Sequence, residues 1–262
     1  MSYWSVALED GIAVATYSNP PMNYMIGPAV LELIDLVQDW QRDDVRVVIL
    51  TGGIAGKFIT HYSVEELIDL ARIPADEMKA INRGYQDFVL GFRRLAKPVI
   101  VALNGDTMGG GFEIALGADI RIAQAGDHRI GLPEVRLGIL PGGTGTQALS
   151  RLVGLARAAE FILCGRVVAP ERARELGLVH EVVPDALARA KEVARDLVSI
   201  SPYALAEAKR ALYQGFELPI VEGCKVESEA FCNTMVSASG LAQMRRYTAL
   251  PFDARRDSID SQ

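Results

Sequence analysis

Residues 96–119 read AKPVIVALNGDTMGGGFEIALGAD, and this stretch decides the fold. Val99–Leu103 is an unbroken apolar run, which predicts a strand buried on both faces of a parallel sheet. Asn104-Gly105 is a turn signal, and three glycines, Gly109–Gly111, lead into a short helix expected over Phe112–Gly117. A buried strand followed by a helix suggests a βαβ unit, so the stretch predicts an α/β protein with a mostly parallel core.

The same alternation of strands and helices continues on both sides of this stretch. Further strands are expected at Trp4–Leu8, Ile12–Tyr17, Val45–Leu50, Ile120–Ala123 and Val179–Val183. Helices are expected over Pro28–Trp40, from a capping box that begins at Ser63, from Pro74 to about Leu95, and over Thr146–Val153. In the helix that ends near Leu95, the residues Met78, Ile81, Tyr85, Phe88 and Phe92 form one apolar face.

From Asp185 onward the pattern is helical only, and Ser201-Pro202 is typical of a helix start. We therefore expect a core over residues 1–195 and a helical region over residues 196–262, which covers the core or docks on a partner subunit.

Composition excludes several classes of function. The chain has 262 residues, of which 50% are apolar and 23% are charged, and its formal net charge is −6. A nucleic-acid-binding protein usually carries a basic face, and the sequence has no dense Lys/Arg cluster, so no nucleic-acid partner is expected. No run of 18 apolar residues and no signal-peptide profile is present, which predicts a cytoplasmic protein with no membrane span.

Metal and nucleotide chemistry also lack sequence support. The three cysteines have no C-x-x-C spacing, and His61, His128 and His180 are scattered, so neither disulfides nor a metal site are expected. Gly142–Gly145 is rich in glycine but lacks the dinucleotide-binding spacing. No Walker A motif or G-x-S-x-G elbow occurs.

Two loops that join a strand to a helix carry the residues best suited to catalysis. Residues 56–63 and 104–113 each leave backbone N–H groups free at a helix N-terminus. Two such donors aimed at one oxygen form an oxyanion hole. Glu113 lies in the first turn of its helix, and Glu134 follows a proline in the loop after the next strand. If these loops meet at one end of the sheet, the two carboxylates can hold a water molecule and divide acid and base roles.

The stretch 96–119 resembles the central signature of the crotonase (enoyl-CoA hydratase/isomerase) family. Residues 131–147, GLPEVRLGILPGGTGTQ, are similar to its second signature. Thr51-Gly52-Gly53 with Phe58 resembles the first oxyanion segment of the family, and residues 165–184 resemble the segment that follows its core. The resemblance extends from about Val6 to Tyr247.

This resemblance implies a spiral core of ββα repeats, a helical C-terminal region, and assembly as a homotrimer or homohexamer. It implies that the N–H groups of Thr60 and Gly110 hold the thioester carbonyl of an acyl-CoA substrate. Family hydratases use two glutamates, which correspond here to Glu113 and Glu134, whereas family isomerases usually keep only the second. The implied reaction is the addition of water across the C2=C3 bond of an enoyl-CoA. It needs no metal or redox cofactor, because coenzyme A is part of the substrate.

Three departures from the family pattern leave the acyl group open. Bulky residues follow Phe58, where Thr60-His61-Tyr62 replaces small residues, and the early loop around Met22 is also unusual. The helix near Ser239–Tyr247 also differs from the usual C-terminal pattern. We expect Met22, His61, Tyr62 and Gly109 to contact substrate, and the bulk at residues 60–62 favours a bulky or polar acyl group. The alternatives are an isomerase, thioester hydrolase or decarboxylase on the same scaffold, and a non-catalytic acyl-CoA-binding or RNA-binding homologue.

Overall fold

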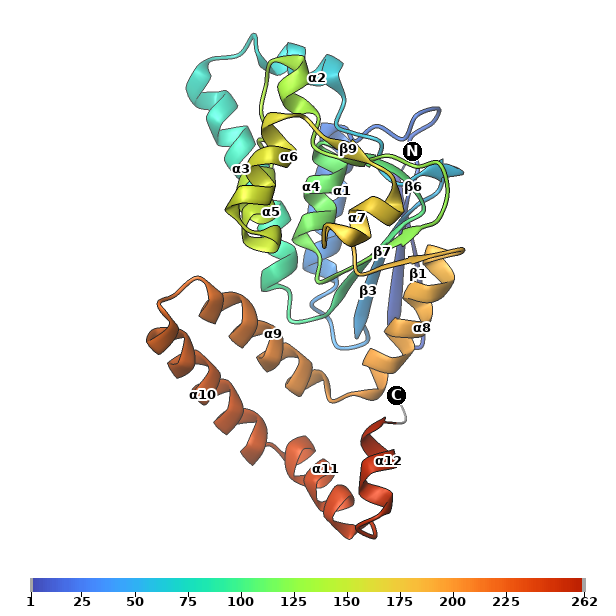
Figure 1. The fold of residues 1–262 in the computed structure, drawn as a ribbon, viewed down its shortest axis with the longest axis vertical. Helices are drawn as coiled ribbons and strands as arrows, with labels where there is room; N and C mark the ends of the chain where they lie inside the picture. The colour runs from blue at the N-terminus through green and yellow to red at the C-terminus, as the bar shows by residue number, and fades with distance from the viewer. Residues whose placement is uncertain (1, 261–262) are drawn as a thin grey trace.

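A computed structural model describes residues 2–260 and shows a mixed α/β core from which the C-terminal helices extend (Figure 1). The larger sheet has the order β1-β2-β3-β5-β7-β10. Its strands are β1 (Trp4–Glu9), β2 (Ile12–Tyr17), β3 (Val47–Gly52), β5 (Val99–Leu103), β7 (Ile120–Gln124) and β10 (Glu181–Val183). Only the β1–β2 pair in this sheet is antiparallel, so the expected mostly parallel core is confirmed.

A second, smaller sheet has the order β4-β6-β8-β9. Its strands are β4 (Gly56–Lys57), β6 (Gly105–Met108), β8 (Ile130–Gly131) and β9 (Val167–Val168). Along the chain, β3, β5 and β7 are each followed by a short strand of this sheet and then by helical structure. That repeat confirms the expected ββα spiral. The sequence predicted a turn at Asn104-Gly105, but Gly105 begins β6 and pairs with Gly56 of β4.

The helices between the strands are α1 (Gly27–Asp39), α2 (Val64–Leu70), α3 (Ala75–Arg94), α4 (Gly110–Gly117), the 3-10 turn η1 (Glu134–Leu137), α5 (Gly145–Val153), α6 (Leu155–Leu163) and α7 (Pro170–Glu175). Alternate residues of the central strands point to opposite faces of the larger sheet. Val48, Leu50 and Val101 pack into the core beneath helices such as α1, α3 and α4. Ile49 and Ile100 pack instead under the helix that covers the other face.

That covering helix is α8 (Ala186–Ser199), which lies along β2, β3, β5 and β7. The expected division between residues 195 and 196 falls inside α8, whereas the chain leaves the sheet only at Ile200–Ser201. A separate C-terminal domain remains a prediction.

Four further helices follow: α9 (Pro202–Phe216), α10 (Ile220–Val236), α11 (Ala238–Ala249) and α12 (Ala254–Asp260). Figure 1 shows α9 and α10 side by side, with α10–α12 away from the sheets.

A buried ion pair fastens α9 to the core. Lys209 Nζ lies 2.7 Å from Asp119 Oδ2 and also donates to the Lys97 carbonyl at 2.8 Å. The other oxygen of Asp119 accepts a hydrogen bond from the Tyr213 hydroxyl at 2.8 Å, and Val99 N–H donates to Asp119 Oδ2. Asp119 thus joins the end of the α4 segment, the start of β5 and helix α9.

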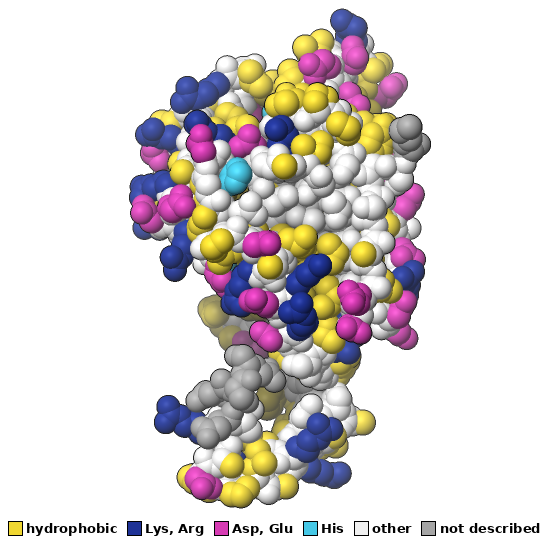
Figure 2. Space-filling model, turned by 90° about the vertical axis from the view of Figure 1, so that its right-hand side faces the viewer, with side chains coloured by type: hydrophobic (Ala, Val, Ile, Leu, Met, Phe, Trp, Pro, Cys, Tyr) yellow, Lys and Arg dark blue, Asp and Glu magenta, His cyan; other side chains and the backbone are white. Residues whose placement is uncertain are grey.

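The remaining sequence expectations concern location and surface charge. No helix among residues 2–260 is long and apolar enough to cross a membrane. The cytoplasmic location remains a prediction. On the face shown in Figure 2, Lys and Arg side chains are interspersed with Asp and Glu, and no basic patch gathers on that face.

Candidate functional site

The two loops chosen from the sequence meet in the structure. Met108 N–H, at the end of β6, donates to the Thr60 carbonyl at 2.9 Å. The buried Asn23 supports the first loop from behind, because its side-chain amide donates to the Phe58 carbonyl and its own carbonyl accepts from Thr60 N–H. Gly111 lies so close to this loop that a Cβ there would overlap the Ile59 carbonyl. The triple glycine therefore lets α4 begin against the first loop.

Two backbone N–H groups are left without an acceptor where the loops meet. Gly110 is the first residue of α4, and neither its N–H nor that of Tyr62 donates a hydrogen bond within residues 2–260. A Cβ built on Gly110 would lie 3.7 Å from the Tyr62 nitrogen, so the two donors are neighbours. Free N–H groups from two segments can bind one carbonyl oxygen, as an oxyanion hole requires.

Thr60, the donor expected from the sequence, does not fit this geometry. Its N–H already donates to the Asn23 carbonyl at 3.2 Å, and its hydroxyl donates to the Met22 carbonyl at 2.6 Å. The structure therefore replaces Thr60 by Tyr62 as the candidate donor of the first loop.

Glu113 is held in the second loop by the start of another helix. It is 4% exposed, and its Oε1 accepts hydrogen bonds from Gly143 N–H at 2.7 Å and Gly145 N–H at 2.8 Å. Burial raises the pKa of Glu113 to about 7, and the nearby Glu134 adds to this rise, whereas the two N–H groups lower it. Oε2 is the oxygen left for other contacts.

Glu134 begins η1 and is 8% exposed. Neither of its carboxylate oxygens has a hydrogen-bond partner among the described residues, which is costly for a buried carboxylate. Burial raises the pKa of Glu134 to about 7 as well. A Cβ on Gly109 would come within 3.3 Å of Glu134 Oε1, so Gly109, at φ +50°, leaves space beside this acid. The structure thus brings both glutamates to the two free donors.

The other residues expected to contact substrate lie around this site. The Tyr62 hydroxyl donates to Glu66 Oε2 at 2.9 Å, and His61 Nδ1 lies 2.7 Å from the Tyr62 carbonyl. The His61 ring also stacks on Tyr24, with 4.1 Å between ring centroids. The Tyr62 hydroxyl and His61 Nδ1 thus have partners within the protein and need none from a polar acyl group. The Met22 side chain is exposed.

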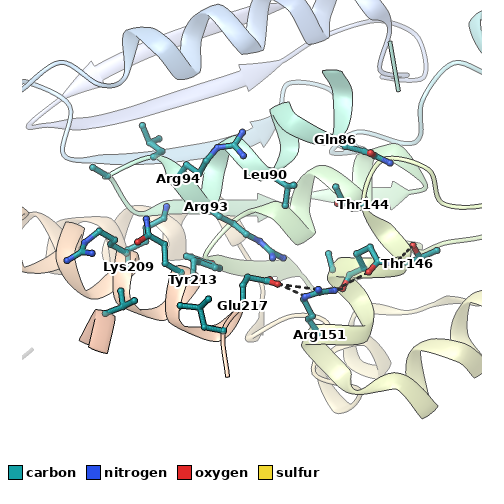
Figure 3. Close-up of a pocket in the computed structure, with 18 of the residues that line it drawn as sticks. Gln86, Leu90, Arg93, Arg94, Thr144, Thr146, Arg151, Lys209, Tyr213 and Glu217 are labelled. Carbon is teal, nitrogen blue, oxygen red and sulfur yellow. Dashed lines mark hydrogen bonds and ion pairs between the residues drawn. The ribbon is translucent and has the colours of Figure 1, made fainter. Parts of the chain in front are cut away.

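A cavity of about 1030 Å³ lies between α3, α5 and α9, behind the loop that holds Glu113 (Figure 3). Gly142 and Thr144 line it, and Gln86 Nε2 donates to the Gly142 carbonyl at 2.7 Å. An ion pair between Arg151 and Glu217, 3.1 Å apart, closes one side. Neither Glu113 nor Glu134 lines this cavity, so the candidate site rests on its polar groups and not on this hollow.

Residues 7–248 match the family model described as enoyl-CoA hydratase/isomerase. The chain belongs to this family. A short-chain-enoyl-CoA hydratase of Clostridium acetobutylicum is 38% identical over 233 residues, with 85% of each chain covered. A methylglutaconyl-CoA hydratase of Rattus norvegicus is 31% identical over 79% of this chain and 67% of the relative.

The fold of this enoyl-CoA hydratase/isomerase family member also matches solved structures. A crystal structure of an enoyl-CoA hydratase from Bacillus anthracis superposes with a TM-score of 0.87 at 29% identity, covering 94% of this chain and 96% of that one. The family resemblance inferred from residues 96–119 and 131–147 is thereby confirmed.

Proposed function

We propose that the protein is an enoyl-CoA hydratase, which adds water across the C2=C3 bond of an enoyl thioester or removes it in reverse. One observation carries this proposal. Two buried carboxylates, Glu113 and Glu134, both with pKa values raised to about 7, lie beside two unpartnered N–H groups. The relatives described above are hydratases, which is consistent with this chemistry.

The geometry assigns a role to each group. The N–H groups of Tyr62 and Gly110 bind the thioester oxygen and stabilise the negative charge that develops on it, so C3 becomes electrophilic. Oε1 of Glu113 accepts hydrogen bonds from two backbone N–H groups. Oε2 takes a proton from a water molecule while the oxygen of that water bonds to C3. Glu134 delivers a proton to C2. Water is consumed, and no redox cofactor or metal enters the proposed reaction.

The proposed substrate is a short, straight enoyl group. At the thioester end the Tyr62 hydroxyl and His61 Nδ1 are bonded within the protein, so neither needs a polar partner on the acyl chain. The Clostridium relative is named for short-chain substrates.

We also propose a homotrimer or homohexamer. Large apolar side chains stay exposed along the C-terminal helices, including Leu212 (71%), Ile220 (81%) and Phe252 (87%). Exposed apolar surface of this extent is typical of subunit contacts.

The test is hydration of crotonyl-CoA, followed by the loss of enone absorbance. Glu113→Gln and Glu134→Gln should each lower kcat by at least ~10²-fold, with little change in the Kd of a saturated acyl-CoA. Glu160→Gln is the matched control, because Glu160 is an exposed glutamate paired with Arg166. Near-normal turnover in either site variant would refute the role assigned to that residue.

A further inference from the structure

The two N–H donors lie on segments far apart in sequence, so something must fix their separation. An oxyanion hole stabilises charge only when its donors are held in place before the reaction. The backbone links the two loops directly, through Met108 N–H to the Thr60 carbonyl and Phe58 N–H to the Asp106 carbonyl. The side chains of Tyr62 and Tyr85 supply further contacts, and both lie beside Gly110.

Tyr62 is anchored by its own side chain. Its hydroxyl donates to Glu66 Oε2 at 2.9 Å, and the same oxygen accepts Gly27 N–H at 2.8 Å. Gly27 begins α1, and Glu66 lies in the first turn of α2, so the carboxylate joins two helix N-termini. Both helix dipoles favour a negative charge there. The Tyr62 ring is therefore held at its far end, while its backbone nitrogen lies beside Gly110.

Tyr85 holds the second donor residue. It lies on α3, and its hydroxyl donates to the Gly110 carbonyl at 3.0 Å. Burial, and then the charges of Glu113 and Glu134 with the neighbouring Tyr62, raise the pKa of Tyr85 well above its usual value, so the phenol keeps the proton that it donates.

The Tyr62 and Tyr85 rings also touch each other. They meet edge to face, with centroids 6.0 Å apart and an interplanar angle of 88°. This is a favourable aromatic arrangement. The Tyr85 ring packs in turn on Phe88, with 5.9 Å between centroids. Gly110 fits between them, because a Cβ there would lie 3.1 Å from Tyr62 Cβ and 3.2 Å from the Tyr85 hydroxyl.

We propose that Tyr85 and the Glu66-anchored side chain of Tyr62 form a frame that sets the separation of the Tyr62 and Gly110 N–H groups. Tyr85 and Glu66 are thus positioning residues, which act through Gly110 and Tyr62 and do not touch the reacting atoms. This inference rests on the proposed function, since it assigns the supports of the same oxyanion hole.

The first test is Tyr85→Phe, which keeps the ring and removes only the bond to Gly110. Loss of a whole oxyanion donor costs ~10²–10³-fold in kcat, and a displaced donor should cost less, about 10-fold or more. KM should stay within about threefold, because carbonyl polarisation acts mainly in the transition state. Glu66→Ala, which removes the acceptor of the Tyr62 hydroxyl, and Tyr62→Phe should lower kcat in the same way through the other donor.

A second readout separates positioning from general damage to the fold. A dienoyl-CoA thioester absorbs at longer wavelength when its carbonyl is polarised, so binding to the wild-type protein should shift its band to the red without turnover. The shift should shrink in Tyr85→Phe and in Glu66→Ala. Tyr213→Phe is the control, because it loses a comparable hydroxyl bond, to Asp119, outside the frame. Its red shift should match the wild type.

Several outcomes would overturn the frame. An unchanged red shift in Tyr85→Phe and Glu66→Ala means that the donors stay in place without these bonds. A lowered kcat with an intact red shift and a displaced pH–rate profile means that Tyr85 acts on Glu113 instead. If Tyr85→Phe does not fold, Tyr62→Phe and Glu66→Ala decide the matter. A wild-type protein that shifts the dienoyl band but hydrates no enoyl-CoA refutes the proposed function and leaves the frame standing.

Discussion

Replacing Glu113 by glutamine should make the protein more stable at alkaline pH while it abolishes most turnover. The pKa of this buried carboxyl is raised from its ordinary value of 4.5 to about 7, chiefly by burial. A raised pKa means that the folded state prefers the protonated acid, whereas the unfolded chain ionises earlier. Stability from this group is therefore fully present below pH 4.5 and is lost as the pH rises towards and through 7.

The size of the effect follows from that pKa difference. Each pH unit corresponds to 1.36 kcal/mol, so ionised Glu113 destabilises the folded state by about 3 kcal/mol above pH 7.5. Glutamine carries no charge, and its amide oxygen can still accept from Gly143 and Gly145 N–H. We expect the free energy of unfolding of Glu113→Gln, relative to wild type, to increase by about 2–3 kcal/mol between pH 5 and pH 8.5.

Urea unfolding of both proteins at equal concentration, at pH 5, 7 and 8.5, measures this difference. Titrating groups other than Glu113 act on both proteins alike, apart from their coupling to it, so most of the remaining pH dependence cancels in the comparison. A stability difference that does not change with pH would show that Glu113 ionises as easily in the folded protein as in the unfolded chain. The acid–base assignment would then lose its physical basis.

Four other predictions concern rate, substrate, assembly and strain. The pH profile of kcat/KM should be a bell centred near pH 7, because activity is lost at low pH as Glu113 is protonated and at high pH as Glu134 ionises; a flat profile from pH 5 to 9 would contradict this. Crotonyl-CoA should be hydrated faster than cyclic or hydroxylated enoyl-CoAs, with His61→Gly retaining this order; a strong preference for a polar acyl group would reverse our view of the pocket. Sedimentation should show a trimer or hexamer, and a monomer at micromolar concentration would exclude both. Thr144→Gly should raise the free energy of unfolding by about 1 kcal/mol, because a β-branched residue at φ +105° with a buried, unpartnered hydroxyl is strained; a lower melting temperature would show that the hydroxyl has a stabilising role.

The parts of the candidate site that depend on residues adjacent in sequence were predictable. Gly109–Gly111 marks a close backbone approach, and Glu113 lies in the first turn of α4. Both features depend only on residues adjacent in sequence, so they can be predicted from the sequence. The apolar run Val99–Leu103 likewise predicts its strand, because burial on both faces requires it.

Residues that depend on contacts far apart in sequence were not predictable in the same way. The resemblance implied Thr60 as the donor, and nothing in the loop shows that Thr60 N–H would be taken by Asn23. Tyr85 lies on the apolar face of its predicted helix, where an aromatic ring is expected to pack in the core. Nothing in the sequence shows that its hydroxyl would bond to Gly110. Gly105 reads as a turn, although pairing with Gly56 makes it the start of a strand.

The capping box predicted at Ser63 forms only in part, because one of its residues bonds to partners outside the motif. Ser63 Oγ accepts from Glu66 N–H at 3.2 Å, as expected. Glu66 does not return the bond to the Ser63 N–H, which donates to the Met25 carbonyl. Its carboxylate binds Gly27 and Tyr62 instead. The sequence thus predicted the Ser63 cap correctly, but it did not show that the Glu66 carboxylate would bind Gly27, which is distant in the sequence.

The hydrogen bonds and the ion pair of Asp119 bear on whether the core can fold without the helices that follow it. Both oxygens of that carboxylate are occupied, and one of them depends on Lys209 of α9. A fragment ending at Ser199 would keep the whole sheet but leave the acid with one backbone donor and no cation. Loss of the Lys209 and Tyr213 partners would remove two of the three bonds that the Asp119 carboxylate makes within residues 2–260 and expose the core surface that α9 covers. We therefore expect such a fragment to be less stable than the whole chain, and the sheet and α9 to unfold together.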